Sequence, residues 1–79
     1  MVAQRTLGQT VSSLKKGGSG IISTFDDEHV AKKMMSMGVL PGAFVKYIRK
    51  APFGGGCYIQ VDNLLIALRN QEAEGIVLR

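Results

Sequence analysis

The chain has 79 residues, of which 46% are hydrophobic and 20% are charged. A chain of this length forms one domain at most and buries roughly 60% of the surface that its unfolded form exposes. This composition excludes a disordered chain, and the length leaves little room for the deep pocket of a self-contained enzyme. We therefore expect one domain over residues 1–79 that is not an enzyme.

Ten basic residues against six acidic residues give the chain a formal net charge of +4. This charge permits an acidic partner, an anionic membrane surface or nucleic acid, and it requires none of them. The basic residues are scattered, which is typical of a solvated surface. A single cysteine, Cys57, cannot form an internal disulfide, and no apolar run reaches the roughly 20 residues of a membrane span. Together these features predict a cytoplasmic protein.

The first half of the chain predicts a helical turn at residues 11–14, a strand at 21–25 and one helix at 27–37. The helix begins after acidic residues that can cap it. Glycine at position 38, followed by Pro41-Gly42, predicts its end. We expect three apolar side chains at helical spacing to form its buried stripe: Val30, Met34 and Met37.

The second half alternates between apolar and polar residues, as half-buried strands do. The pattern predicts a helical turn at 70–75 and strands at 43–50, 57–61, 64–68 and 76–78. Strands this short cannot bury two separate sheets, whereas a closed sheet removes its exposed edges. We therefore predict a mainly β fold, a small five-stranded SH3-like barrel with the single helix covering one end.

Few residues in the chain are suited to metal chemistry or catalysis. Asp26, Asp27, Glu28 and His29 are consecutive, so they point in different directions and are better explained as a helix cap than as a metal site. Cys57 has no nearby base in the sequence and fits a small core residue. The glycine-rich stretches 17–20 and 54–56 lack the following Lys-Ser or Lys-Thr of a phosphate loop. We expect no cofactor and no specific metal site.

Nucleic-acid binding remains an alternative for a small basic barrel. The candidate surface combines Lys46, Arg49 and Lys50 with Tyr47 or Tyr58 as a stacking group. A weak transition-metal carrier that uses His29 or Cys57 is a third alternative.

Apolar residues in two predicted loops are the most informative feature. Val39, Leu40 and Pro41 follow the helix, and Phe53 lies between Pro52 and Gly54. If these side chains are exposed together, they form a surface for a partner. If they are buried, they plug the ends of the barrel.

Four segments of the chain resemble those of FeoA-type domains, in the same order and spacing. Residues 32–42 read KKMMSMGVLPG, 48–54 read IRKAPFG and 67–73 read ALRNQEA. The opening at 14–22 is also similar, and the resemblance covers about residues 7–79. One departure is the run Gly54-Gly55-Gly56, where the family usually has Gly-Asp-Pro.

The resemblance implies a small cytosolic SH3-like barrel that docks to FeoB, the membrane transporter for ferrous iron, and modulates it. On this basis we predict that Val39, Leu40, Pro41 and Phe53 form the docking surface, with Arg49 and Lys50 as charges at its rim. An exposed apolar patch would also favour association between copies of the chain. The remaining motif residues would have structural roles: Gly38, Gly42, Pro52, Gly54, Leu68 and Arg69.

Overall fold

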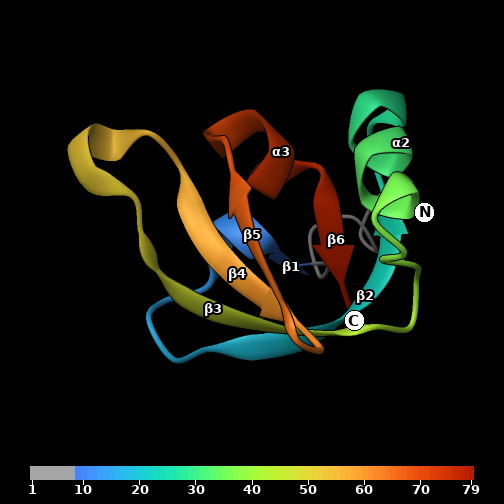
Figure 1. The fold of residues 1–79 in the computed structure, drawn as a ribbon, viewed down its shortest axis with the longest axis horizontal. Helices are drawn as coiled ribbons and strands as arrows, with labels where there is room; N and C mark the ends of the chain where they lie inside the picture. Colours follow the sequence, from blue (N-terminus) through green and yellow to red (C-terminus); the bar gives the residue numbers. More distant parts are fainter. Residues whose placement is uncertain (1–8) are drawn as a thin grey trace.

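The computed structural model describes residues 9–79, which form one antiparallel sheet with two helices, Glu28–Ser36 (α2) and Asn70–Glu74 (α3) (Figure 1). The predicted strands are confirmed, and a short strand is added at the start. Along the sheet the order is β1-β6-β2-β3-β4-β5. The strands are Gln9–Thr10 (β1), Ser19–Phe25 (β2), Phe44–Lys50 (β3), Cys57–Val61 (β4), Leu64–Leu68 (β5) and Ile76–Leu78 (β6).

The second strand bends the sheet, because its two halves pair with different neighbours. Residues 19–21 of β2 pair with β3, whereas 22–25 pair with β6 across a register shift between Ile22 and Thr24. Such an irregularity bends and twists a strand. Helix α3 then connects β5 to β6 and contacts a 3₁₀ turn at Val11–Ser13 (η1). The sheet curls as a result, and the predicted mainly β barrel is confirmed.

The core fills the inside of this curved sheet. On β4, Cys57, Ile59 and Val61 are buried, whereas the side chains between them are partly exposed. This is the alternation that the sequence predicts for a strand with one buried face. Within residues 9–79 no buried side-chain nitrogen or oxygen lacks a hydrogen-bond partner. The remaining core residues are Val11, Ile22, Val30, Met34, Val39, Val45, Tyr47, Ile66, Leu68, Ala73, Ile76 and Leu78.

Helix α2 begins and ends close to the predicted residues. The Asp27 carboxylate accepts a hydrogen bond of 3.0 Å from the backbone N–H of His29, and so satisfies one free donor of the first turn. Val30 and Met34 are buried as predicted, but Met37 is 36% exposed. The predicted burial of Met37 is wrong because this residue is the C-cap of α2. Its backbone angles (φ −97°, ψ 5°) are no longer helical, so helical spacing does not place its side chain. Within residues 9–79 no helix is long and apolar enough to cross a membrane.

A Schellman motif ends α2. Gly38 has a φ of 83°, and its N–H donates to the Met35 carbonyl at 3.0 Å. The N–H of Val39 reaches back to the Met34 carbonyl at 2.9 Å. In this motif the residue after the glycine characteristically packs against the last turn of the helix. Val39 is therefore turned into the core beside Met34.

A polar contact joins α2 to α3 and to β5. The Lys33 ammonium donates to the Glu72 carboxylate of α3 at 2.8 Å and to the Ala67 carbonyl of β5 at 3.4 Å. The same Glu72 oxygen accepts a hydrogen bond of 2.8 Å from the backbone N–H of Arg69. One carboxylate thus joins α2 to the start of α3, while Lys33 also reaches the edge strand β5.

Candidate functional site

The predicted docking residues differ in exposure. Leu40 is 53% exposed, Pro41 is exposed and Phe53 is fully exposed. Val39 is only 2% exposed, so its predicted place on an exposed surface is wrong. The physical reason is the Schellman motif, which turns Val39 inward while the next residue points to solvent. The sequence left open whether these loop residues are exposed or plug the ends of the barrel. Val39 is buried, whereas Leu40, Pro41 and Phe53 are exposed.

The exposed residues do not form one surface. Leu40 and Pro41 immediately precede β3, whereas Phe53 follows it in a second 3₁₀ turn, Pro52–Gly54 (η2). A seven-residue strand spans roughly 20 Å, so the two loops lie at opposite ends of it. Figure 1 shows this separation, with η2 at the upper left and the loop after α2 at the lower right.

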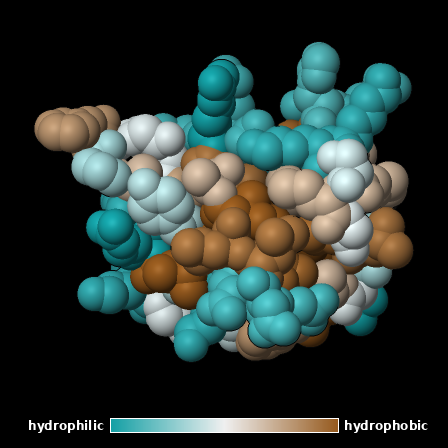
Figure 2. Space-filling view, viewed as in Figure 1, coloured by the Kyte–Doolittle hydropathy of each residue, from teal (hydrophilic) through white to brown (hydrophobic). Residues whose placement is uncertain are grey.

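The end of the sheet near Leu40 carries further exposed apolar residues that the sequence analysis did not single out. Val45 of β3 pairs with Val61, and Val61 pairs with Leu64 at the start of β5. The start of β3, the end of β4 and the start of β5 therefore lie side by side, and Figure 2 shows hydrophobic side chains gathered over the β4–β5 hairpin. We call this region the apolar end, and define it as Met37, Leu40, Pro41, Phe44, Leu64 and Leu65, of which Phe44 and Leu65 lie on the outer side of the sheet and Leu64 on the inner side.

Part of this surface had a signal in the sequence. Leu64, Leu65 and Ile66 are three consecutive apolar residues, and neighbours on a strand face opposite sides of the sheet. Ile66 is buried, so Leu65 between Ile66 and Leu64 must face outward, and it is 65% exposed. The run therefore predicts at least one exposed leucine.

At the other end of β3, the loop that holds Phe53 is fixed at several points. The Ala51 N–H donates to the Gly56 carbonyl at 2.9 Å, and the Asn70 side-chain amide donates to the Gly54 carbonyl at 2.9 Å. Phe53 itself has a φ of 63°, which bulky residues seldom adopt. The loop therefore holds an exposed aromatic ring in an unfavourable backbone conformation.

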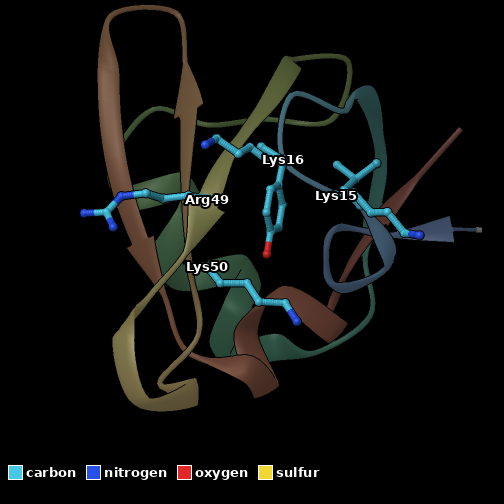
Figure 3. A pocket seen from close by; sticks show the side chains of 6 residues that line it. Lys15, Lys16, Arg49 and Lys50 are labelled. Carbon is cyan, nitrogen blue, oxygen red and sulfur yellow. The ribbon is translucent and has the colours of Figure 1, made fainter.

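A basic pocket lies beside this end of β3. It has a volume of about 420 Å³ and is lined by Leu14 and Tyr47 together with four cationic side chains, and none of its lining residues is acidic. Figure 3 shows that the four cationic side chains come from two segments, the turn after η1 and the end of β3, and that the charged ends of Lys15 and Arg49 extend outward in opposite directions. We define the basic pocket as Leu14, Lys15, Lys16, Tyr47, Arg49 and Lys50.

The aromatic residues of the predicted nucleic-acid surface are poorly placed for stacking. Tyr47 is 4% exposed, so its predicted role as a stacking group is wrong. Its side chain faces inward because β3 alternates, with Val45 and Tyr47 on the buried side. Tyr58 is partly exposed, but the Arg49 guanidinium lies 5.2 Å from the centre of its ring. The arginine therefore already covers one face of Tyr58.

Cys57 is buried at the start of β4, and its thiol interacts with the side chain of Tyr47. Burial raises the pKa of the Cys57 thiol, and the interaction with Tyr47 offsets only part of this. Burial likewise raises the pKa of Tyr47, and the neighbouring Cys57 adds to the effect. Both groups therefore stay protonated at neutral pH, and the thiol is a poor nucleophile.

His29 lies on the exposed face of α2, as predicted for a surface residue in the first turn. Among the described residues, no three His, Cys, Asp or Glu side chains lie close enough together to hold a metal ion. The fold therefore does not bring the candidate ligands named from the sequence into a cluster.

Comparison with known proteins finds a matching family model and several solved structures with the same fold. The family model of the FeoA domain matches residues 9–79. The solution structure of the FeoA protein from Chlorobium tepidum is 30% identical, with a TM-score of 0.79 over 89% of this chain and 69% of that one. The crystal structure of Stenotrophomonas maltophilia FeoA complexed with zinc, described as an SH3 domain protein, is 29% identical, with a TM-score of 0.76 over 90% of this chain and 89% of that one.

A manganese-dependent transcriptional repressor shares the fold alone. It is 15% identical, with a TM-score of 0.79 over 90% of this chain and 40% of the repressor. The comparison with curated proteins gave no match. The family model nevertheless covers every residue that the structure describes, so the chain belongs to the FeoA domain family.

Proposed function

We propose that this protein is an accessory factor of ferrous iron uptake that docks to the cytosolic part of the membrane transporter FeoB and modulates it. Membership of the FeoA family supports the link to iron. A role as a bacterial ferrous iron transport activating factor has been suggested for the Stenotrophomonas maltophilia relative. The observation that carries the docking role is the apolar end, where several large hydrophobic side chains are exposed on neighbouring elements.

The apolar end is suited to protein contact for a physical reason. Scattered exposed apolar residues are normal on a small protein, but a gathered patch is typical of an interaction surface. Leu40, Phe44 and Leu65 are each more than half exposed, and they lie at the same end of the sheet. Covering them with a partner would remove apolar area from water and so favour association.

The opposite end of β3 supplies a second contact in this proposal. Arg49 and Lys50 are exposed there, next to the loop of Phe53. Exposed charges mainly raise the rate of encounter with an oppositely charged surface and fix its orientation. Docking would then act on the transporter by favouring one of its conformations over another.

The docking proposal can be tested with two variants that make the same kind of change at opposite ends of β3. Detergent-solubilised transporter is passed over immobilised wild-type protein, Leu40→Ser or Phe53→Ser, with and without GTP analogues. We expect Leu40→Ser to lose most of the retained transporter, because it removes a large apolar contact from the apolar end. Phe53→Ser should lose less.

Three results would contradict this account. If all three proteins retain the transporter equally, Leu40 is not part of the contact. If only Phe53→Ser loses retention, the docking surface is at the other end of β3. If no protein retains the transporter in any nucleotide state, docking itself is wrong. Circular dichroism of each variant checks that the fold is intact.

A further inference from the structure

We propose that the basic pocket is a second binding site, which takes an acidic peptide segment and receives one apolar side chain of that segment. The site lies at the far end of β3 from Leu40. It shares Arg49 and Lys50 with the second contact of the proposed docking, but its ligand is argued from the pocket alone. The ligand class is a carboxylate-rich stretch of polypeptide that contains an aromatic or large aliphatic residue.

Charge is the first argument for this ligand. Four cationic side chains line the pocket, and acidic residues are absent from its lining. The neighbouring depression, lined in part by Lys50, Cys57 and Asn70, also contains Glu74 and therefore lacks this one-sided charge. Each exposed ion pair contributes little alone, but several charges of one sign around a hollow attract a ligand with several carboxylates.

The shape of the pocket is the second argument. Its volume of about 420 Å³ lies within the range of ligand-binding pockets, and its uncharged lining residues are Leu14 and Tyr47. An apolar floor beneath a charged rim fits a ligand that is apolar at one point and anionic around it. A free inorganic anion would make no apolar contact with Leu14 and Tyr47.

The rigidity of the site is the third argument. The N–H of Gly17 donates to the Tyr47 carbonyl at 3.0 Å, and the N–H of Tyr47 donates to the Gly18 carbonyl at 2.8 Å. These bonds fasten the turn that carries Lys15 and Lys16 to β3. Two halves of the pocket that are distant in sequence are thus already held together, which lowers the entropy lost on binding.

The same residues argue against nucleic acid at this site. Sequence-tolerant binding of single strands needs exposed aromatic faces on which bases can stack. Tyr47 is nearly buried, and Arg49 already lies over the ring of Tyr58. Insertion of one side chain into the pocket does not need such a face.

The test is an NMR titration of the ¹⁵N-labelled full chain with the peptide Glu-Glu-Phe-Glu-Glu. We expect saturable shifts of the backbone amides of residues 14–18 and 47–50. The double variant Lys16→Glu, Lys50→Glu should weaken binding by about tenfold or more, because it reverses two contacts. The double variant Lys32→Glu, Lys46→Glu is the matched control, since it reverses the charge of two exposed lysines outside the pocket, and it should have a smaller effect. Glu-Glu-Ser-Glu-Glu should bind more weakly than the Phe peptide.

Several results would overturn the proposal. Absence of shifts at millimolar peptide concentration would do so, as would shifts confined to the apolar end. An equal loss of affinity in Lys32→Glu, Lys46→Glu would indicate general attraction to a basic protein. Equal binding of the Ser peptide would show that no side chain enters the pocket. A tighter complex with oligothymidine that shifts the same amides would assign the site to nucleic acid.

Discussion

Gly56 shows how one residue holds the loop of Phe53 in place. Its φ is 122°, and a Cβ atom at this position would overlap the carbonyl oxygen of Leu68. Only glycine combines this conformation with such a close approach of two backbones. Gly55 differs, because a Cβ there would lie 3.6 Å from the nearest atom, the carbonyl oxygen of Pro52.

This contrast predicts the effect of two alanine substitutions. Gly56→Ala should lower the free energy of unfolding by about 3 kcal/mol or more, because it adds both a clash and backbone strain. Gly55→Ala should change it by less than about 1 kcal/mol. Urea denaturation followed by circular dichroism measures both. Similar losses in the two variants would contradict the structure of this loop.

The sequence indicates some residue roles better than others. Gly38 can be identified as the end of a helix because apolar periodicity stops there and Pro41-Gly42 follows. The strict need for glycine at position 56 cannot be identified, because it depends on Leu68, which becomes a neighbour only when the loop folds back. Leu68 and Arg69, predicted as structural, form the end of β5 and the N-cap of α3.

At the scale of elements, the Lys33–Glu72 contact joins α2 to α3. Burial acts to raise the pKa of the Glu72 carboxyl, but the hydrogen bonds from Lys33 and from the Arg69 backbone, with the charges of both residues, outweigh it. The net result is a pKa below the usual value. A carboxylate of this kind stabilises the fold at pH values above its unfolded pKa, and the contribution is lost as the pH falls through its folded pKa.

This shift predicts a pH-dependent effect of neutralising Glu72. Glu72→Gln should lower the free energy of unfolding by about 1 kcal/mol at pH 7, because it weakens the contacts to Lys33 and to the Arg69 N–H. The difference from wild type should shrink as the pH is lowered from about 5 to about 3, where the wild-type carboxyl is protonated too. Glu74→Gln, at an exposed position of the same helix, is the matched control. A difference that stays constant with pH would contradict the assignment.

The elements themselves were largely predictable, and the exceptions occur where an element ends. Alternation identified the strands, and the acidic cap with glycine identified α2. Met37 and Val39 were assigned to the wrong environments because both lie just beyond the helix, where a periodicity of 3.6 residues no longer applies. Which side chain faces inward there is set by the C-cap hydrogen bonds rather than by the hydrophobic pattern.

At the scale of the whole molecule, the docking residues predicted from the sequence separate into two surfaces. The motifs around Leu40 and Phe53 are near in sequence, but β3 lies between them and places them at opposite ends of the sheet. Conversely, the sequence analysis interpreted Lys15 and Lys16 as two of the scattered basic residues on a solvated surface. Backbone bonds from their turn to Tyr47 bring them beside Arg49 and Lys50. Hydrogen bonds between segments that are distant in sequence cannot be predicted from the local pattern of apolar and polar residues.

The most direct test of the central claim is the rate of Fe²⁺ uptake by cells whose own copy of this gene has been deleted. The cells would express wild-type protein or Leu40→Ser at equal abundance, with the transporter present. Because docking depends mainly on the apolar end in this account, Leu40→Ser should remove most of the difference in uptake between wild-type cells and cells that lack the protein, whether the wild type raises or lowers the rate. Uptake identical to that of the wild type would contradict the account.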